Sequence, residues 1–251
     1  NAISVMAAAE LPQGSTQPVM RNIPSYYSHK IAYGPVVAEF LRREDPQANF
    51  LDAPLEETLP RMARILQKRI TDVVVLVLDR PRNQAFIDAI RRCGASLRTI
   101  GDGDITAAVA PSLPDSGVDL YVGIGGSPEG VLTATALRAL GGEIQLRMWF
   151  PNPEAKAREV RGVPEPEIQR IYRTRDIVTG DSAIFSATGI IESPLLPGVK
   201  LIGHKAITHT ILMRAKSQTV RYIRAVHDLE KKTIHLRSRG GVGKESKIGK
   251  G

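Results

Sequence analysis

Two arginines in the first half of the chain have the type and spacing needed to bind a phosphate. Arg80 and Arg82 flank Pro81, directly after an apolar stretch at residues 72–78. A guanidinium group can form two parallel hydrogen bonds to a phosphate, and the proline between the arginines stiffens the loop. The segment therefore predicts a phosphate-binding loop, although an Arg-Pro-Arg turn on its own is more often a solvated surface loop.

Two carboxylates follow the next apolar stretch. Asp102 and Asp104 flank Gly103, just after residues 95–100. The glycine lets both side chains face one ligand, where they could accept hydrogen bonds from sugar hydroxyls or bind a hard cation. An isolated Asp-Gly-Asp is usually a turn with a helix cap, so its weight comes from its position next to the other segments.

A glycine-rich segment, residues 123–130, follows the third apolar stretch and ends in Ser-Pro-Glu-Gly. Glu129 is expected at a helix start, where free backbone N–H groups favour an anion or a metal-bridged phosphate. Taken alone, Pro-Glu-Gly is usually no more than the start of a helix. The joint placement of the three segments after three successive apolar stretches is what indicates a binding site.

Strands and helices in alternation must position these loops. Apolar and β-branched runs predict strands, and apolar residues at helical spacing predict helices that stop at Gly94 and Gly141. The predicted order is strand 72–78, helix 86–93, strand 95–100, helix 104–109, strand 118–124 and helix 132–140. This order implies a parallel sheet with right-handed crossovers, which places all three loops on the rim where open sheets bind ligands.

The rest of the chain is less regular. Residues 10–34 contain prolines and glycines and are interpreted as loop and short extended pieces. The apolar opening, residues 2–9, predicts a buried strand, and because the first residue is Asn1 we expect a fragment or a processed product. Further expectations are a helix over 59–66, an exposed helix within 152–176, and strands over 144–150, 183–191 and 218–226.

Composition indicates a globular protein of a reducing compartment. The 251 residues are 42% hydrophobic and 24% charged, enough for a sizeable core. The longest apolar run near the middle, residues 73–78, is too short to cross a bilayer, and no secretory signal is visible. Cys93 is the only cysteine, which excludes an intramolecular disulfide and a thiolate metal cluster. We therefore expect a cytoplasmic protein that does not bind membranes.

The excess of basic residues is concentrated at the C-terminus. Of the formal charge of +8, residues 229–251 contribute +5, from seven Lys or Arg and two Glu. This end is also rich in glycine, which predicts a disordered basic tail at 237–251. A nucleic-acid-binding arm is the alternative, but no aromatic residues accompany the lysines, so a nucleic-acid partner is not expected.

Taken together, the motifs resemble the class II fructose-1,6-bisphosphatase family. The matching segments occur in the family's order and are residues 24–30, 79–82, 102–104, 123–130 and 185–190. The resemblance implies an α/β, layered sugar-phosphatase fold with a mostly parallel sheet flanked by helices and with the N-terminal α+β domain largely missing. Residues 1–34 would be a remnant of that metal-binding domain, 35–236 the sugar-phosphate-binding domain, and 237–251 the tail.

The resemblance also implies an activity, a metal-dependent hydrolysis of a sugar bisphosphate. Members use Mg²⁺ or Mn²⁺ to activate a water molecule, which hydrolyses the 1-phosphate of fructose-1,6-bisphosphate. Some members also hydrolyse sedoheptulose-1,7-bisphosphate. The reaction belongs to gluconeogenesis or the Calvin cycle. Homo-oligomers, either dimers or tetramers, are expected. Tyr27 would contact a substrate phosphate, and Arg80 and Arg82 would hold the phosphate that is not cleaved. Asp102 and Asp104 would bind sugar hydroxyls. Gly126 would let the backbone approach the substrate, and Glu129 would be a metal ligand.

Two departures from the family pattern bear on activity. The family's other metal ligands lie upstream, in a segment ending with Asp-Pro-x-Asp/Glu-Gly-Thr, and no such motif occurs here. Glu129 alone cannot hold a catalytic Mg²⁺, so we expect the chain by itself to be inactive. The second departure is Asn83, where the family commonly has histidine, and this change is expected to tune the site without abolishing it.

Two other functions fit parts of the pattern. Gly123, Gly125 and Gly126 follow a predicted strand, as in a Rossmann-type NAD-binding domain, but the spacing is not Gly-x-Gly-x-x-Gly and Glu129 lies where a pyrophosphate would bind. A non-catalytic family member with a regulatory or structural role is the other alternative.

Overall fold

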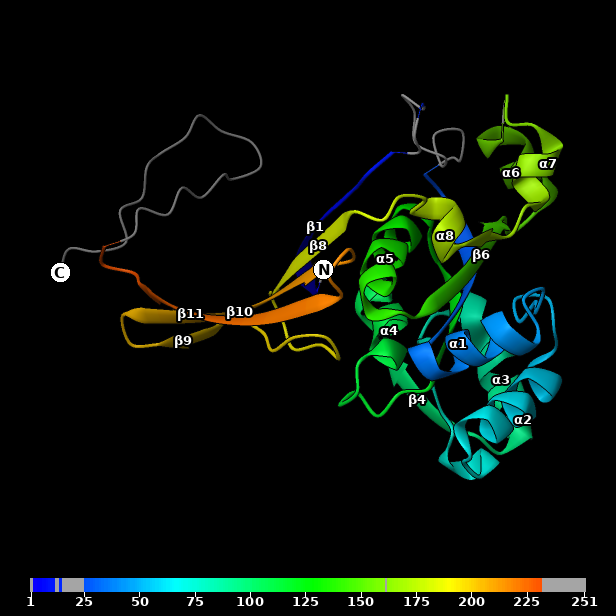
Figure 1. Ribbon diagram of the computed structural model, residues 1–251, viewed down its shortest axis with the longest axis horizontal. Coiled ribbons are helices and arrows are strands. Elements are labelled where there is room, and N and C mark those ends of the chain that lie inside the picture. Colours follow the sequence, from blue (N-terminus) through cyan, green and yellow to red (C-terminus); the bar gives the residue numbers. More distant parts are fainter. Residues whose placement is uncertain (1, 12–13, 15–24, 161, 232–251) are drawn as a thin grey trace.

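The computed structural model describes residues 2–11, 14, 25–160 and 162–231, which form two β-sheets with helices between and beside them (Figure 1). The strands are β1 (Ile3–Ala9), β2 (Tyr27–Tyr33), β3 (Val74–Leu78), β4 (Ser96–Ile100), β5 (Leu120–Gly126), β6 (Glu143–Trp149), β7 (Tyr172–Arg173), β8 (Ala183–Gly189), β9 (Lys200–Ile202), β10 (Lys205–Arg214) and β11 (Thr219–Asp228). The helices are α1 (Pro35–Glu44), α2 (Leu55–Leu66), α3 (Gln84–Cys93), α4 (Asp104–Val109), α5 (Ser127–Leu140), α6 (Pro153–Glu159), α7 (Glu165–Gln169) and α8 (Thr174–Ile177).

The first sheet has six strands in the order β4-β3-β5-β2-β6-β7. The β3 strand pairs in parallel with β4 and β5, whereas β2 runs antiparallel to both β5 and β6, and β7 is antiparallel to β6. The predicted mostly parallel sheet is therefore wrong, because the sheet is mixed. The strand responsible is β2, which lies in the 10–34 segment whose prolines and glycines predict loop and short extended pieces.

The second sheet is antiparallel throughout, in the order β1-β8-β10-β11, with β9 pairing β10. The β10–β11 hairpin extends away from the body of the molecule (Figure 1). The predicted N-terminal strand is present as β1, but it is not buried as expected. Ile3 is buried, whereas the side of β1 that carries Met6 faces solvent, with Met6 61% exposed.

Helices α1, α2 and α3 cover one face of the six-stranded sheet. Val75 and Val77 of β3 point toward this layer and pack in one apolar cluster with Leu59 of α2 and Ile90 of α3. The intervening Leu76 belongs to the cluster on the opposite face. The β3 strand is thus buried on both sides, as its continuous apolar sequence predicts.

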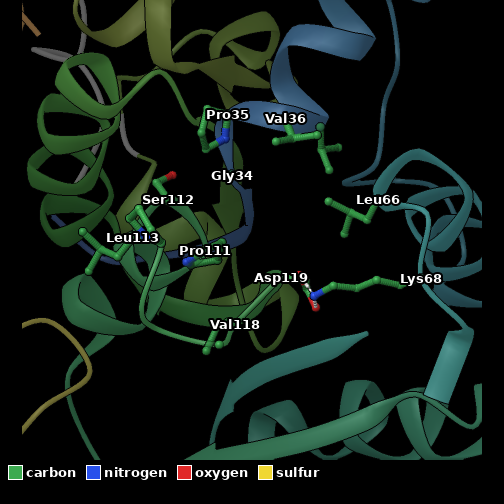
Figure 2. Close-up of a pocket in the computed structure, with 13 residues that line it drawn as sticks. Gly34, Pro35, Val36, Leu66, Lys68, Pro111, Ser112, Leu113, Val118 and Asp119 are labelled. Carbon is green, nitrogen blue, oxygen red and sulfur yellow. Dashed lines mark hydrogen bonds and ion pairs between the residues drawn. The ribbon is translucent and has the colours of Figure 1, made fainter. Parts of the chain in front are cut away.

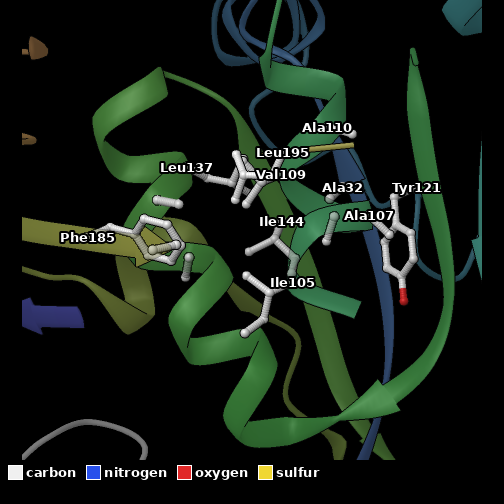
Figure 3. Close-up of a cluster of buried hydrophobic side chains, with 14 of the residues drawn as sticks. Ala32, Ile105, Ala107, Val109, Ala110, Tyr121, Leu137, Ile144, Phe185 and Leu195 are labelled. Carbon is white, nitrogen blue, oxygen red and sulfur yellow. The ribbon is translucent and has the colours of Figure 1, made fainter. Parts of the chain in front are cut away.

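Helices α4 and α5 lie between the two sheets. The cluster drawn in Figure 3 joins Ile105 of α4 and Leu137 of α5 to Ile144 of the six-stranded sheet and Phe185 of the second sheet. A helix in this position must be apolar nearly all around, which the alanine- and leucine-rich sequence of α5 provides. These two helices therefore share one core with both sheets.

Several local predictions are confirmed. Helices α3 and α5 end at Gly94 and Gly141, whose φ angles are +73° and +80°, a left-handed conformation that glycine adopts at low cost. The helix expected within 152–176 is present as α7, and α6, the two-residue strand β7 and the start of α8 lie in the same range. The 237–251 tail lies outside the described residues, and the assignment of 1–34 to a separate domain stays a prediction. No helix in the described part of the chain is long and apolar enough to span a bilayer.

Candidate active site

All seven residues predicted for the site line a single cavity of about 450 Å³. The cavity lies at the carboxyl ends of β3, β4 and β5, and the antiparallel strand β2 adds its first residue to the same edge. The predicted residues in its wall are Tyr27, Arg80, Arg82, Asp102, Asp104, Gly126 and Glu129. Segments up to 102 positions apart in the sequence, from Tyr27 to Glu129, thus meet at one place, as the topology of strand ends requires.

The arginine loop is fastened to β5 by two side chains. Asn83 is fully buried; its Nδ2 donates to the carbonyl of Leu78 at 3.0 Å and its Oδ1 accepts from the N–H of Ile124 at 2.8 Å. Arg82 donates from Nε to the carbonyl of the same Ile124 at 2.9 Å. The ladder between β3 and β5 joins only Val75–Leu120 and Leu76–Tyr121. Asn83 therefore supplies hydrogen bonds where the two strands diverge and the site opens.

Aromatic rings support the same guanidinium group. The Arg82 guanidinium lies over the ring of Tyr27, 4.8 Å from its centroid, and Tyr27 meets Trp149 edge to face at 6.4 Å. A cation over an aromatic face is attracted to it and held in one orientation. By contrast, Arg80 is exposed, and its Nη1 lies 3.3 Å from the carbonyl of Asp79. The loop thus presents one anchored and one exposed guanidinium.

Asp104 takes part in a buried polar network. Its Oδ2 accepts a hydrogen bond from the ammonium group of Lys30, and its Oδ1 accepts one from the hydroxyl of Tyr121. The same ammonium donates to the carbonyl of Gly126 at 2.6 Å. Burial and the adjacent Asp104 carboxylate raise the pKa of Tyr121 well above its usual value, so the phenol stays protonated and donates.

The glycine-rich turn admits two carboxylates because it lacks side chains. A Cβ on Gly125 would lie 2.0 Å from Asp104 Oδ2, and a Cβ on Gly126 would lie 1.9 Å from Glu129 Oε2. Glu129 is in the first turn of α5, half-buried, where the free N–H groups of the helix favour negative charge. Glycine at 125 and 126 is therefore required for both carboxylates to approach the cavity.

Comparison with known proteins agrees with this geometry. The family model described as bacterial fructose-1,6-bisphosphatase, glpX-encoded, matches residues 1–227. The fructose-1,6-bisphosphatase class 2 of Haemophilus influenzae is 39% identical over 242 residues, covering 92% of this chain and 68% of that protein. The fructose-1,6-bisphosphatase 1 class 2 of Escherichia coli K12 is 33% identical over 243 residues, with the same coverage. The chain belongs to the class II fructose-1,6-bisphosphatase family.

Membership of the class II fructose-1,6-bisphosphatase family identifies the chain as a phosphatase homologue. It favours a phosphatase function over the dinucleotide-binding alternative. The family's phosphatases are metal-dependent. Among the described residues, however, no three His, Cys, Asp or Glu side chains lie together as a metal-binding group. Asp104 is engaged by Lys30 and Tyr121, and Glu129 is the ligand that the family resemblance predicts. The described residues alone therefore do not form a complete metal site.

Sequence reasoning missed several parts of this class II site. Lys30 and Tyr121 hold Asp104 from behind, and Ala2 together with Ile3 and Val5 of β1 adds an apolar wall to the cavity. Lys30 carried a signal, since a lysine between residues of an apolar strand is unusual in a core. No sequence signal predicted that β1 would line the cavity, because its position there depends on long-range pairing with β8 in the second sheet. None of residues 185–190, the last family motif, lines the cavity.

A second cavity lies at the opposite ends of β2 and β5, and it contains none of the predicted site residues. Its volume is about 370 Å³, and Figure 2 shows mostly apolar side chains around it, among them Leu66, Pro111 and Val118. Its charged groups, Lys68 and Asp119, are paired at 2.7 Å. Because Lys68, the cationic side chain in its lining, is paired with Asp119, this cavity is poorly suited to bind the phosphate of a sugar phosphate.

Proposed function

We propose that this chain forms the substrate-holding part of a sugar-bisphosphate phosphatase and that its substrate is fructose-1,6-bisphosphate, the compound in its relatives' names. The observation that carries the proposal is the meeting of two guanidinium groups, two aspartates, a glycine turn and Glu129 around one cavity. Sedoheptulose-1,7-bisphosphate is the second candidate substrate, to be compared in the same assays. The pathway, the dimeric or tetrameric state and a non-catalytic role stay predictions.

Arg80 and Arg82 would hold the phosphate that is not cleaved. Arg82 is oriented by Ile124 and by the ring of Tyr27, so little conformational entropy remains to be lost when a phosphate binds. Arg80 is exposed and can close on the phosphate from the solvent side. Tyr27, which lines the cavity at the start of β2, would contact a substrate phosphate next to Arg82.

Asp102 and Asp104 would bind sugar hydroxyls. The two residues flank Gly103, which has a φ of +105° and so turns the loop back toward α4. Each oxygen of Asp104 already accepts one hydrogen bond, and a carboxylate oxygen has two lone pairs. One acceptor position on each oxygen therefore stays available for a hydroxyl, which suits a polyol better than a metal ion. Gly126 would let the backbone approach the sugar.

Glu129 would contribute one ligand to a Mg²⁺ or Mn²⁺ ion, which polarises phosphate and activates water when bound. One carboxylate is too few for a site that lasts without substrate, and the described residues contain no group of three or more possible metal ligands. We therefore derive binding and orientation from this chain and no hydrolytic step. The 251-residue chain by itself is proposed to bind the bisphosphate without turning it over.

Isothermal titration calorimetry with fructose-1,6-bisphosphate tests the binding role. Replacing Arg82 by Met removes a charged hydrogen-bond donor and should weaken binding by about 10- to 100-fold, since such contacts are worth ~1.5–3 kcal/mol. Arg91→Met is the matched control, because Arg91 lies exposed on α3 away from the cavity. Equal affinity of both variants and the unmodified chain would contradict the assignment of the cavity.

Phosphate release tests the second part of the proposal. The 251-residue chain is incubated with fructose-1,6-bisphosphate and Mn²⁺, and inorganic phosphate is measured over time. No release above the background without protein is expected, because no group of three or more possible metal ligands lies together among the described residues. Robust multiple turnover, abolished by Glu129→Gln, would show that this chain completes its own metal site and would overturn the proposal of binding alone.

A further inference from the structure

Lys30 is a buried cation at the centre of the six-stranded sheet. It lies on β2, between β5 and β6, and its side chain is 0% exposed. It points to the face covered by α4 and α5, where its stem passes close to Gly130 of α5. Burying an ammonium group is costly unless it is paired and hydrogen-bonded, so a lysine at this position needs a compensating interaction.

The compensating contacts of Lys30 come from two different segments of the site. The ammonium donates to Oδ2 of Asp104, at the start of α4, and to the carbonyl of Gly126, at the turn between β5 and α5. Tyr121 on β5 donates to the other oxygen of the same carboxylate. One cation therefore connects the aspartate loop to the glycine-rich turn.

Lys30 and Tyr121 are not in the wall of the cavity, whereas Asp104 and Gly126 are. Both donors thus act from beneath the site, and a bound ligand would meet the groups that they hold. With a donor on each oxygen, the Asp104 carboxylate has a single favoured orientation. The pairing also offsets a negative charge that would otherwise repel a phosphorylated ligand.

The glycine-rich turn is held in the same way. The Gly126 carbonyl is directed to Lys30, and a peptide plane fixed at its carbonyl is also fixed at the following N–H. The following residue, Ser127, begins α5 and forms a side-chain hydrogen bond of 2.5 Å with Ser28, the neighbour of Lys30 on the same face of β2. Strand β2 therefore sets the position of the first turn of α5, which carries Glu129.

We propose that Lys30, assisted by Tyr121, is a positioning residue that orients Asp104 and the Gly126 peptide for recognition of the sugar part of the substrate. The inference rests on the proposed function, because it assumes that Asp104 faces a sugar hydroxyl. It predicts that loss of Lys30 affects the sugar contacts more than the phosphate contacts, which belong to Arg80 and Arg82.

The test compares two ligands by calorimetry, fructose-1,6-bisphosphate and inorganic phosphate, on three forms of the full chain. Lys30→Met keeps the length of the side chain and should weaken bisphosphate binding at least about tenfold, or ~1.4 kcal/mol. Binding of inorganic phosphate should change by less than about threefold, or ~0.7 kcal/mol. Lys68→Met is the matched control, since Lys68 pairs with Asp119 at the opposite ends of the strands, and neither affinity should change.

Two further variants keep the test decisive if Lys30→Met does not fold. Tyr121→Phe removes one donor to Asp104 and keeps the buried ring. The double variant Lys30→Met, Asp104→Asn removes both charges of the pair, which is far less destabilising than removing one. Both should fold, as judged by circular dichroism and thermal unfolding. Tyr121→Phe should lose bisphosphate affinity selectively because Asp104 keeps its charge but loses one of its two donors. The double variant should lose it because the carboxylate itself is absent.

Each outcome bears on a different claim. Wild-type affinity for the bisphosphate in folded Lys30→Met or Tyr121→Phe would overturn the positioning role and leave the proposed function intact. Equal weakening for both ligands, reversed by Asp104→Asn in the double variant, would show that only net charge matters and would also overturn it. Absence of bisphosphate binding by the unmodified chain would instead refute the proposed function.

Discussion

Asn83 offers a sharp test of how the site is held open, because its side chain replaces part of the sheet. It donates to Leu78 and accepts from Ile124 at the point where the β3–β5 ladder has ended. In Asn83→Ala a buried carbonyl and a buried N–H lose their partners. Each unsatisfied group costs about 1–3 kcal/mol, so for two groups the free energy of unfolding should fall by about 2–6 kcal/mol.

Urea unfolding followed by circular dichroism and by the fluorescence of Trp149, the single tryptophan, measures this change. For a chain of this size the expected decrease in Tm is about 5–25 °C. Bisphosphate binding should weaken as well, because Arg82 is adjacent and bonds to the same Ile124.

Asn49→Ala is the matched control. Asn49 also forms two side-chain hydrogen bonds, donating to Asp52 Oδ2 at 2.8 Å and accepting from the Asp52 N–H at 3.1 Å, but it is exposed. Water can replace both bonds, so the variant should lose less than about 1 kcal/mol. If Asn83→Ala and Asn49→Ala destabilise the chain equally, the idea that Asn83 substitutes for the ladder is wrong.

Two more predictions concern local packing and pH. Gly126→Ala should displace the Glu129 carboxylate, which would lie 1.9 Å from the new Cβ, and so weaken bisphosphate binding in the presence of Mn²⁺ with little change in Tm. Gly101→Ala is the control, because no heavy atom lies within 4 Å of its Cβ position. Unchanged bisphosphate binding by Gly126→Ala would contradict the close approach of Glu129. Burial and the nearby Arg147 guanidinium lower the pKa of His29 to about 4. The unfolded chain therefore binds the extra proton between about pH 6.5 and pH 4, and over that window the free energy of unfolding should fall by up to about 3 kcal/mol as the pH falls. His29→Leu should lose this part of the pH dependence in urea titrations, and an unchanged pH profile would refute it.

The sequence by itself determined the local elements around the site. Continuous apolar runs, helical spacing and glycine stops predicted β3, β4, β5, α3, α4 and α5 to within a few residues. Because three of these strands are parallel neighbours, the loops after them had to share one rim, and Arg80, Asp102 and Glu129 do line one cavity. Periodicity and turn chemistry are properties of neighbouring residues, so they can be deduced without the fold.

Only the tertiary structure decided what lies between and beneath those loops. The insertion of β2 between β5 and β6 depends on pairing over about 90 to 120 positions, and no local pattern specifies a partner at that distance. The same insertion places Lys30 under Asp104 and Gly126, where it becomes the buried counterion of the site. Likewise, Asn83 differs from a surface-loop asparagine because two strands happen to diverge around it. Side-chain types could be assigned to a chemistry from the sequence, but their burial and partners are set by long-range contacts.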